Sequence, residues 1–371
     1  MDWQAYPDES NIEEIKRIIE KYFRVYETKQ EGNVMAFFIE IPVEENLLQQ
    51  NFDSLRKELK KRNLIPFLRQ KGGESLIFIA YHPPVKGKPS WINLFLFITT
   101  IVTTTLSGAI FFLAKEENLL DLFKIKNLLN GFIFFSFPLL SILGIHELGH
   151  YFVSKKHGVA TSLPFFIPIP PNPILPLGTM GAVISMREPI PDRKALLDIG
   201  VAGPIAGFLV SIPVLIIGLS MSKIIPQPEK FLELGEPLLI IFISHFFFPH
   251  IEPGYIVSLH PTAFAGWVGL LVTAINLLPA GQLDGGHVAR AVLREKHRYA
   301  SFATIIFLAS LTFIGMGNWL FLLLLLIFLI GTEHPPALNE YVSLDTKRKL
   351  LALLALIIFI LCFTPMPISS K

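Results

Sequence analysis

The 24 residues from Trp91 to Ala114, WINLFLFITTIVTTTLSGAIFFLA, contain no charged side chain. A helix over such a run can cross the hydrocarbon core of a bilayer, which needs about 20 apolar residues. Because lipid offers the backbone no hydrogen-bond partner, the run favours a helix, which satisfies its own peptide groups. Composition agrees, since 51% of the 371 residues are hydrophobic and 17% are charged. The sequence therefore predicts an integral membrane protein.

Later apolar runs predict a polytopic helical protein with about seven spans. After the first run we expect spans at about Leu128–Ser154, Ala195–Met221 and His260–Ala280, a helical hairpin over Ser301–Ile330 that breaks at Gly315–Asn318, and a last span at about Leu350–Phe363. The segment Glu236–Phe248 is short for a span, so we expect it to lie at the interface or to re-enter the membrane. These runs define a membrane domain over residues 89–371.

Residues 1–88 form a different kind of segment, rich in charge and in turn signals. Their pattern predicts the order α-β-β-α-β-β, with hairpin turns at Gln30–Asn33 and Gly72–Gly73. A linker follows at His82–Pro89. The sequence thus predicts a small soluble α+β domain ahead of the membrane domain.

Lysine and arginine near the predicted span ends indicate the orientation. Most of them fall on one side: Lys155, Lys156, Arg187, Arg193, Lys194, Arg290, Arg294, Lys296, Arg298, Lys347, Arg348 and Lys349. The positive-inside rule assigns that side, and the N-terminal domain with it, to the cytoplasm. We therefore expect a multi-pass protein of the plasma membrane that is embedded in, and in contact with, the lipid bilayer. A net charge of +2 gives no reason to expect a nucleic-acid partner, and the single Cys362 excludes an internal disulfide.

The second predicted span carries His146-Glu147-x-x-His150. Residues i and i+4 lie on one face of a helix, so both imidazoles can face one metal ion. Zinc accepts imidazole nitrogen, and Glu147 adjoins the first ligand, where it can act as a base. Ionisable groups within a membrane are costly and indicate function. A hydrogen-bonded polar cluster and a proton or ion pathway are the alternatives.

A catalytic zinc site usually has three protein ligands, so a third is needed. Asp284 is the best candidate, because it follows an apolar span and precedes a basic stretch, which matches its depth to the histidines. Asp198, His287 and the pair Glu333-His334 are rivals. An acid near the start of a helix is explained by the helix dipole alone, which weakens the case for Asp198. The remaining candidates His245, His250 and His260 belong to the other side of the membrane in this topology.

These residues resemble the site-2 protease family of intramembrane zinc metalloproteases. The His-Glu-x-x-His motif at residues 146–150 matches the family's first motif, and Asn276-x-x-Pro279-x-x-x-x-Asp284-Gly285 matches the second. The tight Asn-Pro-Asp-Gly form of some members is absent. GTMGAVISM at Gly178–Met186 is similar to the family's glycine-rich β segment. The resemblance covers roughly Leu128–Arg294 and is closest to the prokaryotic and plastid branch that lacks a PDZ domain.

The resemblance implies a fold, a reaction and residue roles. One zinc ion would be bound by His146, His150 and Asp284, with Glu147 as the base. Asn276 would help to hold the substrate or the oxyanion. The partners would be transmembrane proteins, cut within a membrane-spanning helix.

The segment between the two motifs also carries information of its own. Ser162–Pro191 contains eight prolines and so cannot be one helix. Irregular apolar backbone at membrane depth is tolerated only when it is buried in protein or lines a cavity. Within it, a β-permissive stretch could offer a strand edge to an unwound substrate. We predict substrate contacts at Gly178, Gly181, Val183 and Ile184, and an ordinary loop is the alternative.

Two other functions remain open from the residues alone. A membrane zinc protease of another family would cut outside the bilayer and take its third ligand from Glu333. A metal or proton transporter would need charged groups through the full bilayer depth. The sequence concentrates them on one side, which favours the protease.

Overall fold

The computed structural model describes residues 9–31, 34–82, 87–113, 118–172, 176–229, 231–315, 319–331 and 334–370. The chain divides into two compact units, which are considered one at a time. The first consists of Met1–Gly87, Arg187–Leu196 and Pro335–Thr346. The second consists of Lys88–Met186, Leu197–His334 and Lys347–Lys371.

The first unit contains the predicted α-β-β-α-β-β order. Its elements are α1 (Glu9–Glu20), β1 (Arg24–Glu31), β2 (Val34–Glu40), α2 (Glu45–Lys60), β3 (Leu64–Lys71) and β4 (Glu74–Tyr81). The strands form an antiparallel sheet in the order β1-β2-β4-β3. Buried side chains such as Ile19, Phe37 and Leu55 pack the helices on one face of the sheet. The small α+β region is therefore confirmed.

The two hairpin turns of this unit differ in what can be said of them. Gly72 and Gly73 have φ values of +62° and +89°, a region that glycine adopts without strain, and they form the second turn as predicted. In the first predicted turn, Gly32 and Asn33 lie outside the described residues, as do residues 83–86 of the predicted linker.

Two segments from much later in the chain complete the first unit. The backbone N–H of Leu68 on β3 donates to the carbonyl of Leu338 over 2.9 Å, and Leu68 also bridges Asn339 in parallel, at the edge of the sheet. The Ser343 hydroxyl donates to Glu45 over 2.6 Å, which lowers the pKa of that carboxyl below its ordinary value. Residues 187–196 and 335–346 are thus held by side chains and backbone of the N-terminal elements.

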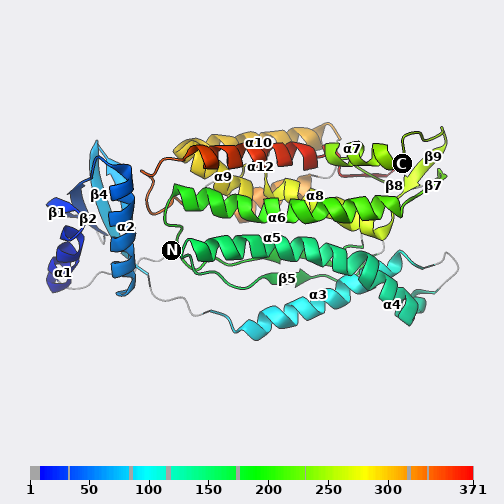
Figure 1. Cartoon of the computed structure of the whole chain (residues 1–371), viewed down its shortest axis with the longest axis horizontal. Coiled ribbons are helices and arrows are strands. Elements are labelled where there is room, and N and C mark those ends of the chain that lie inside the picture. Colours follow the sequence, from blue (N-terminus) through cyan, green and yellow to red (C-terminus); the bar gives the residue numbers. More distant parts are fainter. Residues whose placement is uncertain are drawn as a thin grey trace. The chain divides into compact units, whose positions relative to one another are not determined.

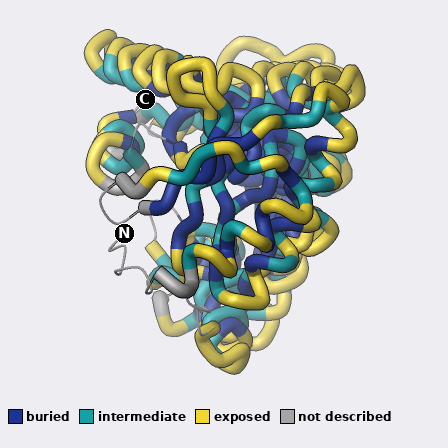
Figure 2. The backbone as a smooth tube through the Cα atoms, turned by 90° about the vertical axis from the view of Figure 1, so that its left-hand side faces the viewer, coloured by how far each residue is buried: buried dark blue, intermediate teal, exposed yellow. Residues whose placement is uncertain are grey.

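The second unit is built on long apolar helices. Three are long and apolar enough to cross a membrane: α3 (Ser90–Ile110), the continuous helix Ile125–Lys156, and α6 (Arg193–Ser220). Figure 1 shows α5 and α6 side by side along the unit. In Figure 2, exposed residues lie on the outer side of the helices and buried residues lie on the inner side. Exposed apolar side chains on these helices, such as Phe95 and Leu209, suit contact with lipid.

The remaining elements are shorter than the predicted spans. They are η1 (Leu119–Phe123), β5 (Phe165–Pro168), β6 (Thr179–Val183), β7 (Lys223–Pro226), β8 (Leu232–Leu234), α7 (Leu238–Phe247), β9 (Tyr255–Ser258), α8 (Pro261–Asn276), α9 (Asp284–Leu293), η3 (Arg294–Lys296), α10 (His297–Phe313), α11 (Leu320–Leu325), η4 (Leu326–Ile330), α12 (Thr346–Cys362) and β10 (Ile368–Ser370). Among the described residues, therefore, three of the seven predicted spans are supported by length and composition, and the others stay predictions. The predicted break at Gly315–Asn318 falls mostly on residues 316–318, outside the described part of the chain.

The helix Ile125–Lys156 changes its winding before it reaches the motif. It runs as α4 (Ile125–Gly131), a π-helical turn η2 (Phe132–Ser136) and α5 (Phe137–Lys156). Pro138 has no N–H, so the carbonyl of Phe134 loses its helical partner. The Thr262 hydroxyl at the start of α8 donates to that carbonyl over 2.7 Å. This bond ties the helix that carries the motif to α8, which ends at Asn276.

Candidate metal centre

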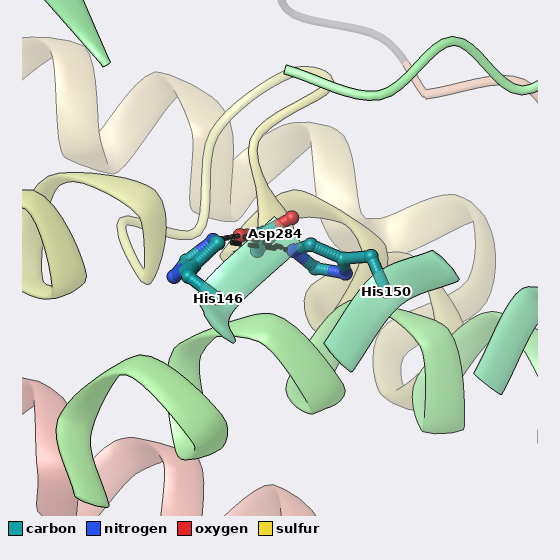
Figure 3. A group of neighbouring side chains, drawn as sticks. All are labelled: His146, His150 and Asp284. Carbon is teal, nitrogen blue, oxygen red and sulfur yellow. Dashed lines mark hydrogen bonds and ion pairs between the residues drawn. The ribbon is translucent and has the colours of Figure 1, made fainter. Parts of the chain in front are cut away.

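Helix α5 presents the two histidines of the motif side by side. His146 and His150 are one turn apart, and both rings are buried. Figure 3 shows the two rings and the Asp284 carboxylate pointing toward one another. The i, i+4 spacing alone produces the pairing of the rings, as the sequence predicts.

Asp284 reaches the histidines from the first turn of α9. The chain leaves α8 at Asn276 and turns sharply before α9 begins at Asp284. An added Cβ at Gly285 would overlap the carbonyl of Leu277, and one at Gly286 would overlap the carbonyl of Gly281. These glycines permit the tight return of the backbone that brings the carboxylate to the histidines.

The three donor atoms have the spacing that a metal ion requires. Asp284 Oδ2 lies 3.3 Å from His146 Nε2 and 3.2 Å from His150 Nε2, and the two nitrogens lie 3.2 Å apart. A tetrahedral zinc ion with bonds of about 2.0–2.1 Å would hold its ligand atoms about 3.3–3.4 Å apart. Within the described part of the chain, no other group of histidine, cysteine or acidic side chains has metal-site geometry. The residues present therefore fit zinc, one ion per chain.

The orientation of His150 is set by α6. Its Nδ1 lies 2.8 Å from the carbonyl oxygen of Ile199, to which the ring N–H donates, so Nε2 is left to face the other donors. One turn further along α6, an added Cβ at Gly203 would overlap Nε2 of His150. An added Cβ at Gly207 would come within 3.1 Å of Nδ1 of His146. The glycines of α6 thus make room for both imidazoles.

Gly203→Ala should therefore weaken zinc binding without unfolding the helix. The methyl group would push His150 out of line with the other donors, and we expect metal affinity to fall by about 10–100-fold, as for other residues that orient ligands. Gly144→Ala on α5 is the matched control, because its Cβ would meet only Phe166 at an ordinary 3.7 Å. Zinc titration of both purified variants checks this, and equal affinities would contradict it.

Glu147 lies beside the cluster but outside it. Its Oε1 is 4.0 Å from His146 Nε2, and Glu147 does not belong to the group of three donors. The backbone N–H of Ile184, just after β6, approaches its carboxylate. A buried carboxylate that adjoins the ligands without joining them is suited to move a proton.

The predicted substrate residues fall in three different surroundings. The Asn276 amide lies 3.3 Å from His146 Nε2, so this residue is at the centre itself. Gly178 accepts a hydrogen bond from Thr103 over 2.7 Å and sits too close to α3 for any side chain, which gives it a packing role. Gly181 is open, with φ of +103°, and Val183 is half exposed. Their contacts with a substrate stay predictions.

Two of the rival ligands, Asp198 and His287, have other partners. Asp198 is bound by His157 and Arg348 rather than by the histidines of the motif. His287 lies against His334, with ring centroids 4.3 Å apart, and its Nδ1 faces the Leu283 carbonyl. Glu333 lies outside the described residues.

Sequence reasoning missed the contribution of α6. The Ile199 carbonyl carries no sequence signal, because every residue has one. Gly203 and Gly207 form a small-residue pattern that close helix packing explains by itself. Their four-residue spacing matches that of the two histidines, and this is the signal that could have paired the helices.

Comparison with known proteins gives relatives of one kind. The family model described as Peptidase family M50 matches residues 134–316. The probable zinc metalloprotease EGY1, chloroplastic, of Arabidopsis thaliana is 31% identical over 62% of this chain and 42% of its own length. The corresponding EGY1 protein of Oryza sativa subsp. japonica is 29% identical over 62% of this chain and 40% of its own. The probable zinc metalloprotease EGY2, chloroplastic, of Arabidopsis is 28% identical over 69% of this chain and 46% of its own.

The chain thus spans less than half the length of these relatives. No solved structure matches it. The relatives' names place those proteins in the chloroplast, so they lend no support to the expected plasma-membrane location.

Proposed function

We propose that this chain is a zinc endopeptidase of the site-2 protease family that cleaves transmembrane segments of other proteins. The match of residues 134–316 to Peptidase family M50 supports the family. One observation carries the proposal. Two buried histidines on a membrane-length helix and Asp284 from α9 form a three-donor cluster with zinc spacing, beside a carboxylate that does not join it. Together these are the parts of a hydrolytic zinc site.

The residues of the cluster and those around it would have different roles in the reaction. His146, His150 and Asp284 would hold zinc, which when bound polarises a peptide carbonyl and makes water a better nucleophile. Glu147 accepts the proton of the attacking water and passes it to the leaving amine, so the nitrogen departs neutral. The Asn276 amide, 3.3 Å from a ligand atom, would donate a hydrogen bond to the carbonyl oxygen under attack.

The hairpin β5-β6 supplies the means to hold a substrate. One edge of β6 pairs with β5, and at the end of the strand the N–H of Ile184 faces Glu147. A transmembrane helix must unwind locally before its peptide bond can be attacked. Unwinding exposes backbone groups that cost several kcal/mol each when unpaired in hydrocarbon. Pairing with the β6 edge beside Glu147 offsets that cost.

Proline at this edge should impair cleavage while sparing the metal. Val183→Pro removes a backbone donor of β6, whereas Ile184→Pro removes the donor that faces Glu147 and so also affects the proposed base. We expect both to keep zinc and to cleave transmembrane peptides several-fold more slowly, with a smaller loss for peptides that already contain central glycine or proline. Ile184→Ala and Val183→Ala keep the donors and serve as controls. Proline variants that fold, bind zinc and cleave at the wild-type rate would eliminate the pairing.

The distribution of lysine and arginine supports an orientation in the membrane. We propose that the N-terminal domain lies on the membrane side that carries most of the lysine and arginine near the predicted span ends. The plasma membrane is the setting we propose, with this domain in the cytoplasm.

Metal analysis and a cleavage assay test the function together. The wild type should contain one zinc per chain and His146→Ala much less, and the wild type in liposomes should cut a single-span peptide with a glycine-rich centre. Removing zinc with a chelator should stop cleavage, and returning it should restore cleavage. Equal zinc in wild type and variant would refute the site. Mass spectrometry of the products locates the cut, and a cut outside the span would favour the zinc protease of another family.

A further inference from the structure

Asp198 holds three helices together close to the metal centre. The residue lies on α6, and its Oδ2 is 3.0 Å from Nε2 of His157, which follows the last residue of α5. Arg348, in the first turn of α12, donates to Oδ1 over 2.9 Å and to Oδ2 over 2.5 Å. The carboxylate is mostly buried, with 18% of its side chain exposed. A bidentate arginine at a sheltered carboxylate fixes both position and orientation.

The next residue along α6 contacts a metal ligand. The Ile199 carbonyl accepts the hydrogen bond from Nδ1 of His150 over 2.8 Å. That bond sets the ring orientation and the nitrogen that is offered to the metal. Any rotation or slide of this turn of α6 would move the carbonyl with it. The bonds of Asp198 to α5 and α12 oppose such movement.

We propose that Asp198 is a positioning residue for the metal centre, acting through the Ile199 carbonyl on His150. The inference rests on the proposed function in one respect, that the buried donor cluster binds a metal ion. It assigns to an ion pair outside the ligand set the task of holding α6 in register with α5. Arg348 then matters to the metal centre although it lies on a helix that supplies no ligand.

A purely structural role would have different consequences. If the ion pair only stabilised the fold, its loss would lower the unfolding temperature and leave the ligand geometry of the folded protein unchanged. A positioning role changes the geometry at the metal. Cobalt(II) is a suitable probe, because its visible absorption depends on the arrangement of its ligands.

The experiment loads the purified full chain with cobalt(II) and records the visible spectrum and the rate of metal release to a chelator. We expect Asp198→Ala to shift the spectrum and to release cobalt about 10-fold faster, at the lower end of the range for residues that orient ligands. Asp198→Asn and Arg348→Met should show the same change to a smaller extent. Asp198→Glu, which can still bind Arg348, should restore most of the wild-type behaviour.

The control and the double variant decide the interpretation. Asp121 lies in η1 rather than α6, and its carboxylate pairs with Lys124 at 3.2 Å. Asp121→Ala should leave the spectrum unchanged. Asp198→Ala combined with Arg348→Met should be no worse than Asp198→Ala alone. Folded variants with the wild-type spectrum and release rate, or strictly additive effects, would overturn the proposal. A wild type that binds no cobalt would instead remove the proposed function.

Discussion

Glu147→Gln is expected to keep one zinc ion per chain and to lose proteolysis by about 10²–10⁴-fold, the range for loss of a general acid–base group. Glutamine has nearly the shape of glutamate but cannot accept the proton of the attacking water. Glu147 is 4.0 Å from the nearest ligand nitrogen and outside the donor group, so its charge is not needed to hold zinc.

Zinc analysis and peptide cleavage, measured on the same preparation, check this prediction. Glu295→Gln provides the control, because Glu295 is an exposed acid in η3 of the same unit. It should retain both zinc and activity. If Glu147→Gln lost zinc together with activity, Glu147 would have to be counted as a ligand.

Asp284→Ala should lose both zinc and cleavage. It removes one of three donors, and two histidines alone make a weak zinc site. We expect metal affinity to fall by more than the roughly 10–100-fold effect of residues that only orient ligands. Asp284→Asn should be less severe, since its side-chain oxygen can still reach the metal but carries no charge.

The control for Asp284 comes from the same turn of the chain. Gln282 is exposed and lies two residues earlier, so Gln282→Ala should bind zinc as the wild type does. Competitive titration with a zinc chelator compares the three variants. Wild-type affinity in Asp284→Ala would mean that the third ligand is another residue, and Glu333 would then be the first to test.

The features that the sequence predicted all depend on interactions between residues that are close together in the chain. A charge-free run of 24 residues has to satisfy its peptide groups internally, and α3 (Ser90–Ile110) covers most of it. The spacing of His146 and His150 puts their rings on one helix face wherever that helix is placed. The strand alternation and the glycine pair at Gly72 and Gly73 produced the second hairpin for the same local reason.

The number of spans shows where local reasoning stops. Hydropathy marks apolar runs, but it does not say how long a helix each run will form. The run at His260–Ala280 becomes a helix of 16 residues, because the chain turns after Asn276 to form α9. The run at Glu236–Phe248 becomes a helix of ten. At about 1.5 Å per residue, ten residues cover about 15 Å, half the hydrocarbon core.

What only the tertiary structure decided was which distant groups meet. The sequence left Asp198, His287 and Glu333 as rivals to Asp284, because depth alone cannot choose between residues more than 40 positions from the motif. The fold brings Asp284 to 3.2 Å from His150 across 134 positions, through the tight turn at Gly285 and the glycine face of α6. The hydrogen bond from His150 to Ile199 could not be read from the sequence, since a backbone carbonyl has no identity there. Periodicity fixes the face of a helix on which a residue lies, whereas the partner of that face depends on how closely every other helix can approach.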